Sequence, residues 1–316
     1  MARHKKIRST APVAGQEGLI VSHFGVEVLV RFAGGAGGSS EERMVKVKRN
    51  SGHVVGDQVR VCGEVLQRLE RRNCLRRRDA MDKERIIVAN LDLLGIVVAP
   101  KPQTPAGFLE RAVVAARANN IEPCLIVNKC DLALAESLRQ QLSADFPAIT
   151  RLFTLSAHSG VGLDALRAYI AECGRAAFIG VSGAGKSSIM NVLAPQAKLE
   201  IGALNDDDHG CHTTSFSTLI SLPSGGELVD TPGFRDFAPV DISSEEIAMW
   251  FPGLMTIMQQ RPCRFRNCRH RQEPGCSVKQ AVTEGQLSAE RYQLYLNTLA
   301  DLEGLEQAGA ERRKPF

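Results

Sequence analysis

A glycine-rich segment in the middle of the 316-residue chain has residue types suited to phosphate groups. It fits the G-x4-G-K-[ST] pattern of a P-loop. Glycines let backbone N–H groups turn toward phosphate oxygens, Lys186 brings a positive charge to the β- and γ-phosphates, and Ser187 offers a hydroxyl to Mg²⁺. A ligand-free glycine turn is the alternative, and the pattern alone does not choose between ATP and GTP. The candidate phosphate-binding residues are Gly180, Val181, Ser182, Gly183, Ala184, Gly185, Lys186 and Ser187.

A second motif, Asn128-Lys129-Cys130-Asp131, bears on the choice of base. The carboxylate of Asp131 accepts two hydrogen bonds, and guanine offers two adjacent donors where adenine presents an acceptor. Alone, this tetrapeptide is a weak pattern, because polar residues commonly follow strands. Its weight comes from Ser156 and Ala157, which follow the next expected strand, where guanine-binding domains carry a backbone contact to the guanine oxygen. Together the two motifs predict a guanine site formed with Asn128 and Lys129.

A third motif, Asp230-Thr231-Pro232-Gly233, also follows an expected strand. Asp230 is suited to the Mg²⁺ shell, with Ser187, and the Gly233 amide is suited to sensing the γ-phosphate. Between this motif and the P-loop lies His212-Thr213-Thr214, in a loop rich in glycine and aspartate. Either threonine could close on Mg²⁺, and we slightly prefer Thr214.

The residue after Gly233 bears on hydrolysis. Ras-like enzymes carry a glutamine there to orient the attacking water, but this chain has Phe234, which has no group to do so. We therefore expect slow unaided hydrolysis. His212 is the candidate catalytic residue, because it adjoins the switch threonines; a solvated loop histidine is the alternative.

The order of these motifs is unusual. Conventional GTPases run from the P-loop to the guanine motifs, whereas here the guanine motifs at 128 and 156 precede the P-loop at 180. The sequence therefore predicts a circularly permuted GTPase domain, whose chain leaves Gly233 for the C-terminal domain.

A metal cluster is expected near the C-terminus. Cys263-x4-Cys268-x-His270-x5-Cys276 offers three thiolates and one imidazole. This set closes a tetrahedral Zn²⁺ site and leaves no position for catalytic water, so we expect one structural zinc ion. Buried cysteines beside a solvated histidine are the alternative.

The remaining composition sets the class of protein. A hydrophobic share of 44% and a charged share of 23% are typical of a soluble globular protein. The other six of the nine cysteines are scattered and fit a reducing compartment. No secretion leader opens the chain and no apolar run is long enough for a bilayer, so we expect a cytoplasmic protein that binds no membrane. We also expect a monomer.

The elements that position these motifs follow from local patterns. Residues 1–14 are basic and aperiodic, which predicts a flexible arm. Short strand-like runs with glycine turns then predict an OB-like β-barrel over 15–80, although an SH3-like barrel would leave a similar pattern. After an arginine-rich connector, alternating strands and helices predict a parallel α/β GTPase domain over 81–238. Helical periodicity predicts a helical zinc-knuckle domain over 239–316.

Basic residues cluster at 3–8, 68–78 and 261–271, although the net charge of the chain is only +4. Such clusters suit a polyanion such as RNA. A solvated face or a mobile tail is the alternative for each cluster.

The barrel, the permuted motifs G-x-S-G-x-G-K-S-S, H-T-T and D-T-P-G-F, and the C-x4-C-x-H-x2-E-x2-C knuckle together resemble the ribosome-small-subunit-dependent GTPase A family of bacteria. The resemblance extends from about residue 18 to about residue 302. It implies a late maturation factor of the 30S ribosomal subunit that binds 16S rRNA. It also implies that the subunit stimulates hydrolysis of GTP to GDP and phosphate, and that hydrolysis leads to release.

The resemblance also carries over residue by residue. The nucleotide-binding positions fall on Asn128, Lys129, Asp131 and residues 180–188, which adds Ser188, and the zinc ligands fall on the four residues of the knuckle. Ala184 stands where valine is usual, and Cys211 where an arginine often precedes H-T-T. The glycine-rich insertion over 34–40 has no assigned role.

Two other functions account for part of the pattern. An RNA-binding scaffold would use GTP only to order its domains, with negligible turnover. A P-loop kinase would leave the guanine motifs at 128–131 and 156–157 unexplained.

Overall fold

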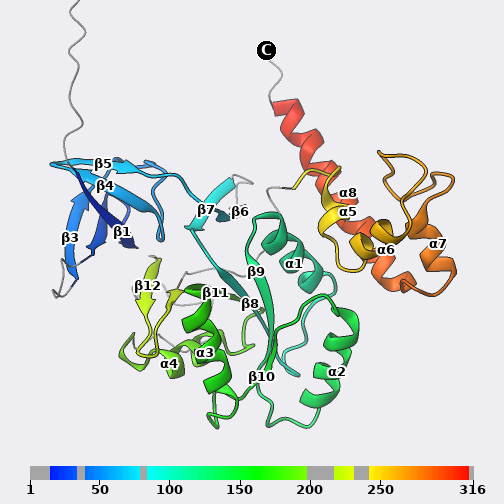
Figure 1. The fold of residues 1–316 in the computed structure, drawn as a ribbon, viewed down its shortest axis with the longest axis horizontal. Coiled ribbons are helices and arrows are strands. Elements are labelled where there is room, and N and C mark those ends of the chain that lie inside the picture. Colours follow the sequence, from blue (N-terminus) through cyan, green and yellow to red (C-terminus); the bar gives the residue numbers. More distant parts are fainter. Residues whose placement is uncertain (1–14, 34–39, 79–83, 198–216, 231–241, 313–316) are drawn as a thin grey trace, which may run out of the picture.

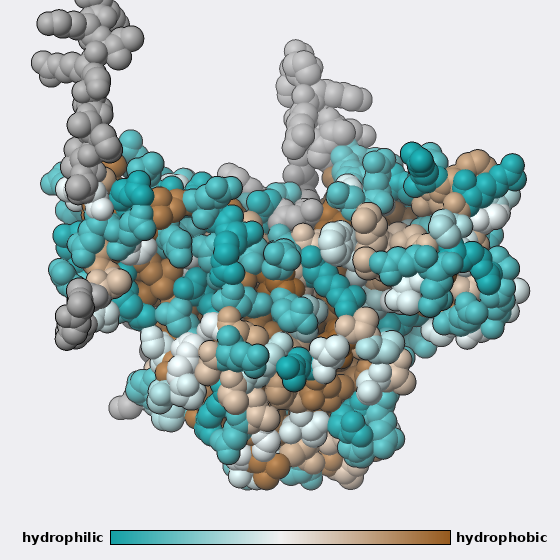
Figure 2. Space-filling model, in the orientation of Figure 1, coloured by the Kyte–Doolittle hydropathy of each residue, from teal (hydrophilic) through white to brown (hydrophobic). Residues whose placement is uncertain are grey.

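The computed structural model describes residues 15–33, 40–78, 84–197, 217–230 and 242–312. A β-barrel and a helical C-terminal domain lie on opposite sides of a central α/β domain, hereafter the G domain (Figure 1). Hydrophilic residues dominate the visible face of the two outer parts (Figure 2). Within the described ranges, every helix is too short or too polar to cross a membrane.

The barrel is built from short strands whose residues alternate between interior and exterior. In β2 the side chains of Val28, Val30 and Phe32 are buried, whereas those between them are not. These residues pack with Ile20 and Val59 in a small apolar core. The strands are β1 (Gln16–His23), β2 (Glu27–Phe32), β3 (Glu41–Lys46), β4 (Gln58–Cys62) and β5 (Val65–Arg68).

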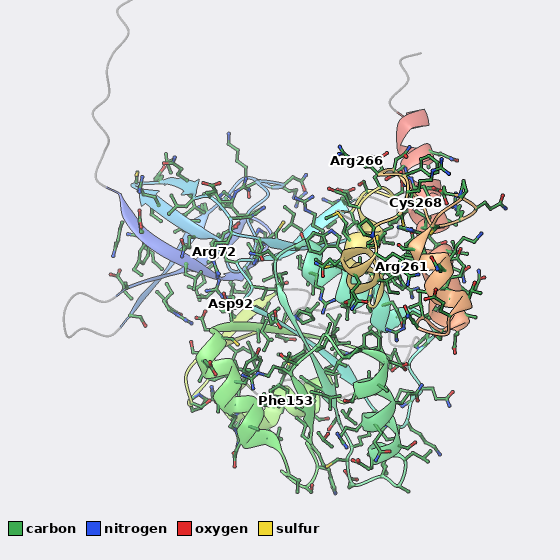
Figure 3. The ribbon with its side chains drawn as sticks, turned by 45° about the vertical axis from the view of Figure 1, so that its right-hand side comes forward. Arg72, Asp92, Phe153, Arg261, Arg266 and Cys268 are labelled. Carbon is green, nitrogen blue, oxygen red and sulfur yellow. The ribbon has the colours of Figure 1, made fainter. Side chains whose placement is uncertain are left out.

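The arginine-rich connector is an antiparallel hairpin rather than a simple linker. Strands β6 (Cys74–Arg78) and β7 (Glu84–Ala89) pair with each other. Leu75 and Val88 are buried in the same core as the G domain sheet, which anchors the hairpin. Arg72, just before the hairpin, forms a 2.8 Å ion pair with Asp92 at the start of the sheet (Figure 3).

The predicted parallel sheet forms the centre of the G domain. The strands run in the order β10-β9-β8-β11-β13-β12, all parallel except β12. Their bounds are β8 (Leu93–Val98), β9 (Glu122–Val127), β10 (Leu152–Thr154), β11 (Arg175–Ile179), β12 (Thr218–Ser221) and β13 (Glu227–Asp230).

Helices cover both faces of this sheet, as its alternating side chains require. Leu94, Ile96 and Val98 of β8 lie in the core beneath α1 and α2, whereas Leu93 and Val97 lie in the core beneath α3 and α4. The helices are α1 (Phe108–Ala118), α2 (Ala135–Asp145), α3 (Leu163–Cys173) and α4 (Lys186–Leu193), followed by a 3₁₀ turn, Pro195–Ala197.

The sheet continues from the G domain into the barrel. Strand β1 pairs with β12 through Ser22 and Thr218. An ion-pair cluster supports this junction, because Glu227 of β13 lies 3.0 Å from Arg31 of the barrel and 2.8 Å from Arg175 of β11. The barrel and the G domain are therefore joined by backbone and side-chain bonds.

The C-terminal domain packs on the G domain through α1. Val114 of α1 lies in the core of the C-terminal domain, beside Ile247, Phe251 and Leu299. The helices are α5 (Ile247–Trp250), α6 (Leu254–Gln260), α7 (Ser277–Thr283) and α8 (Ala289–Arg312).

Arg291 of α8 also lies at this contact. Its guanidinium lies 3.7 Å from carboxylate oxygens of Glu110 and of Asp145, and 4.5 Å from the ring centre of Phe146. Glu110 is buried, so its ion pair with Arg291 is partly desolvated, and the cost of burying the charge opposes the attraction between the two groups.

Candidate nucleotide and metal sites

The glycine-rich segment forms a tight turn between β11 and α4, as predicted. Gly180 has φ 155° and Gly185 has φ 97°. A Cβ atom on Gly180 would lie 2.3 Å from the Val97 carbonyl oxygen, so no other residue fits there without a backbone shift. The ammonium group of Lys186 donates to the carbonyls of Gly180 and Val181, at 2.7 and 3.0 Å. The Lys186 side chain thus folds back onto the first two residues of the P-loop.

Asn128 connects three loops at the carboxyl ends of the strands. Its side-chain amide donates to the Ala184 carbonyl at 2.9 Å, and its side-chain oxygen accepts from the Ala157 backbone N–H at 3.1 Å. A Cβ atom on Gly185 would lie 2.1 Å from the same amide nitrogen. The fold therefore brings together three motifs that are far apart in the sequence.

Lys129 adds a second connection. Its ammonium group donates to the carbonyls of Gly183 and Lys101, both at 2.8 Å. Lys101 belongs to the loop after β8, which no motif had indicated. Lys129 therefore links the P-loop to a neighbouring loop.

Asp131 is exposed and ionised, as a hydrogen-bond acceptor for a base requires. The Ser156 hydroxyl donates a hydrogen bond to its carboxylate, and this bond lowers the pKa of Asp131 below its usual range. Ser156 itself is fully buried. The hydroxyl thus fixes the carboxylate at the edge of the site and leaves it accessible.

Asp230 ends β13 at the same edge of the sheet as the P-loop, because β13 runs parallel to β11. Burial raises the pKa of this carboxyl group. A divalent cation would favour the ionised form and offset that cost, so the residue fits the chemistry of a Mg²⁺ shell. Ser187 lies in the first turn of α4. The other expected switch residues, His212, Thr214, Gly233 and Phe234, lie outside the described residues.

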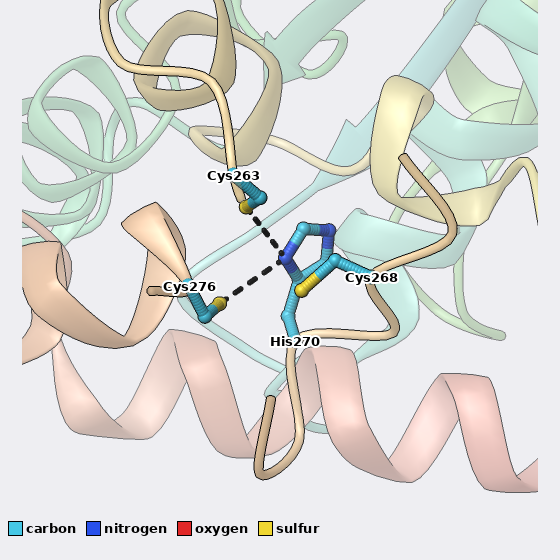
Figure 4. A group of neighbouring side chains, drawn as sticks. All are labelled: Cys263, Cys268, His270 and Cys276. Atoms are coloured by element: carbon cyan, nitrogen blue, oxygen red, sulfur yellow. Dashed lines mark hydrogen bonds between the residues drawn. The ribbon is translucent and has the colours of Figure 1, made fainter. Parts of the chain in front are cut away.

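The three cysteines and the histidine of the knuckle converge as predicted (Figure 4). Their candidate ligand atoms all lie within 4.8 Å of one another. Nδ1 of His270 lies 3.6 Å from the Cys263 sulfur and 3.4 Å from the Cys276 sulfur. A tetrahedron with ordinary Zn–S and Zn–N bonds has S···N edges of about 3.6 Å, so the cluster fits a zinc ion in both chemistry and size.

Burial shapes the acid–base properties of this cluster. It raises the pKa of the Cys268 thiol to about 12 and lowers the pKa of His270. The imidazole is therefore neutral, as a metal ligand must be, whereas thiolate ligation of a cation would release protons.

Residues around the cluster hold its ligands in place. Glu273 accepts hydrogen bonds from the backbone N–H groups of Arg269 and Arg271, both at 2.8 Å. Tyr292 of α8 donates to the His270 carbonyl at 2.5 Å. Glu273 belonged to the sequence motif, but its role as a backbone anchor could not be read from spacing, and nothing in the sequence indicated Tyr292.

A parallel α/β sheet with a P-loop after β11, contacted in space by a guanine motif that precedes it in the chain, defines the molecule as a circularly permuted GTPase. Comparison with known families agrees, because residues 68–239 match the RsgA GTPase family. The chain belongs to the RsgA GTPase family.

Named relatives cover nearly the whole chain. The protein "Small ribosomal subunit biogenesis GTPase RsgA" of Chromohalobacter salexigens is 37% identical over 287 residues, which are 88% of this chain and 84% of that protein. The protein of the same name from Pseudomonas fluorescens Pf-5 is 34% identical over 302 residues, 91% of this chain and 86% of that one.

Two solved structures share the architecture. YjeQ from Thermotoga maritima has a TM-score of 0.70 and 28% identity, covering 92% of this chain and 99% of its own. YloQ, described as a circularly permuted GTPase, has a TM-score of 0.66 and 26% identity, with full coverage of both chains.

Proposed function

We propose that this protein binds the small (30S) ribosomal subunit and hydrolyses GTP as a late maturation factor, with hydrolysis stimulated by the subunit and coupled to release. The observation that carries the enzymatic part is the connection made by Asn128 between the P-loop and the two guanine motifs. The names of the relatives support the ribosomal part. On this proposal the protein acts in the cytoplasm, as a monomer, on 16S rRNA within the subunit.

The proposed roles follow the positions of the residues. Asp131 selects guanine, Lys186 and the backbone of the P-loop bind the phosphates, and the hydroxyl of Ser187 and the carboxylate of Asp230 hold Mg²⁺, which neutralises phosphate charge when bound. Thr214 and Gly233 complete the switch. The proposed GTP-binding set is Asn128, Lys129, Asp131, Ser156, Ala157, residues 180–188 and Gly233. Cys263, Cys268, His270 and Cys276 hold one structural Zn²⁺.

This protein lacks the glutamine that orients the attacking water in Ras-like enzymes, because Phe234 occupies that position. We assign that role to His212, once the 30S subunit orders its loop. The test is GTP and ATP turnover with and without purified 30S subunits. GTP hydrolysis should rise at least tenfold with subunits, and His212→Ala should remove most of this rise without weakening GTP binding.

Each failure has a separate meaning. Fast hydrolysis by the isolated protein would contradict activation, and negligible turnover under all conditions would favour the GTP-ordered scaffold. Full stimulation of His212→Ala would place the catalytic group elsewhere.

Binding to rRNA is proposed from the arginines of β6, on the hairpin beside the barrel (Figure 1). Affinity for 30S subunits should fall steeply with salt, because bound phosphates release counterions. Neutralising Arg76, Arg77 and Arg78 together should reduce the salt slope, by about 1 for each phosphate that the protein no longer neutralises. An affinity that does not change with salt would indicate that the protein binds a protein surface of the subunit instead of RNA.

A further inference from the structure

The arginines of the zinc knuckle divide into two groups. Arg261, Arg269 and Arg271 form ion pairs with Glu284, Glu245 and Glu303, at 3.1, 3.3 and 2.6 Å. These pairs connect the knuckle to α8, to the residue after α7 and to the segment before α5. The basic cluster seen in the sequence is therefore partly a structural device.

The other two arginines of the knuckle, Arg264 and Arg266, are not part of these ion pairs. Residues 264–267, Arg-Phe-Arg-Asn, connect the ligands Cys263 and Cys268, and we call them the knuckle tip. All four are exposed, and among the described residues neither Arg264 nor Arg266 has a carboxylate partner. In Figure 3, Arg266 lies at the margin of the C-terminal domain, beyond Cys268.

An aromatic residue, Phe265, lies between these two arginines in the sequence. Phe265 is 41% exposed, so one face of its phenyl ring is open to a ligand. The guanidinium of Arg264 lies 5.5 Å from the centre of this ring. The tip contains no acidic residue, so it combines a flat apolar surface with two positive charges.

The tip is also held in a fixed shape. The Arg264 backbone N–H donates to the Gly275 carbonyl at 3.1 Å, and the Cys268 N–H donates to the Phe265 carbonyl at 3.3 Å. Ligand residues bound to one metal ion would fix both ends. A preordered loop loses little conformational entropy when it binds.

We infer that the knuckle tip binds single-stranded RNA, with an unpaired base stacked on Phe265 and the adjacent phosphates contacted by Arg264 and Arg266. Every base presents a flat face, so stacking tolerates sequence, and guanidinium groups suit phosphates. Duplex RNA does not fit, because its bases are stacked on each other and its major groove is deep and narrow. This inference rests on the proposed function, in which the protein acts on ribosomal RNA.

The test uses the full-length, zinc-loaded protein and a short uridine-rich RNA that carries one 2-aminopurine, whose fluorescence falls on stacking. The wild type should bind and quench it. Phe265→Ala should weaken binding by roughly 5- to 100-fold and abolish quenching, whereas Phe265→Tyr should keep both. Arg264→Gln and Arg266→Gln should each lower the salt slope by about 0.7.

Controls separate the tip from the rest of the domain. Met255 of α6 is 42% exposed in the same domain, and Met255→Ala should bind like the wild type. Each variant should retain its zinc. Equal binding and quenching by Phe265→Ala, or equal binding of a blunt duplex, would overturn the inference.

Weaker binding of Phe265→Ala to 30S subunits, without any change toward the RNA probe, would also overturn it and would indicate a protein partner. The proposed function fails separately, if 30S subunits do not stimulate the wild-type GTPase, because the RNA probe involves no subunit.

Discussion

The nucleotide site draws on residues from Asn128 to Asp230, whereas the zinc cluster takes its four ligands from between Cys263 and Cys276. Parallel strands with a core on each face hold the first site, and bonds such as Asn128 to Ala184 join its loops. Around the zinc cluster, only His270 and Cys276 are buried among residues 261–276. The nucleotide site is thus positioned by the hydrophobic core, whereas the zinc cluster is positioned by the ion that it binds. Mutations should therefore disrupt the two sites in different ways.

Loss of zinc should have the largest effect. It should affect the zinc knuckle and leave the nucleotide site unchanged. Cys268→Ala, or chelation, should remove about one Zn²⁺ per chain and the ordered structure of the knuckle, because structural zinc contributes about 10–16 kcal/mol in small domains. Metal analysis, limited proteolysis and GTP titration measure this. GTP binding should survive.

Cys173→Ala provides the matched control, since Cys173 lies on α3 outside the cluster. It should retain zinc. A protein purified without metal and resistant to proteolysis in the knuckle would refute the structural role.

Asp131→Asn should have the next largest effect, on the nucleotide site alone. Two hydrogen bonds to a charged acceptor contribute about 1.5–3 kcal/mol each, so GTP affinity should fall by roughly 10²- to 10⁴-fold. Xanthine nucleotides should bind better, because their 2-oxo group suits the new amide. Competition titrations with GTP, XTP and ATP measure the change.

Asp164→Asn is the control for this variant, because Asp164 is an exposed residue of α3 with a surface ion pair to Arg167. Its nucleotide affinity should not change. Equal competition by ATP in the wild type would show that the guanine assignment is wrong.

The smallest effect concerns the contact between the G domain and the C-terminal domain, at Glu110 of α1 and Arg291 of α8. Burial raises the pKa of Glu110 above its ordinary 4.5, against the opposing influence of Arg291. A raised acid pKa stabilises the fold fully below about pH 4.5, and this contribution is lost as pH rises through the folded-state pKa. Glu110→Gln should therefore gain stability relative to the wild type as the pH rises through the folded-state pKa of Glu110.

Urea unfolding at pH values from 4 to 8 measures this difference, in which other titrating groups largely cancel. Parallel pH profiles for the two proteins would contradict the role of Glu110.

The sequence predicted the local features well, because each depends on neighbouring residues. Alternating strands and helices placed the P-loop between β11 and α4, and ligand spacing placed the knuckle residues together. The hairpin β6-β7 was not predicted, since Leu75 and Val88 are buried only once the G domain packs against them.

Contacts between distant residues were also beyond sequence patterns. Val114 looks like an ordinary apolar residue of α1, yet it belongs to the core of the C-terminal domain. Likewise, Arg261 and Arg266 lie in one basic cluster, but only the structure pairs Arg261 with Glu284. Composition gives the number of charges, whereas folding decides which of them form ion pairs.

The pairing of Ser22 in β1 with Thr218 in β12 also bears on self-association. Without the barrel, β12 would be the last strand of the G domain sheet and would present unpaired N–H and C=O groups to water. Such an exposed edge is a template for a strand from another molecule. A variant that lacks the N-terminal barrel, including β1, should therefore aggregate, even though it retains every nucleotide-binding motif.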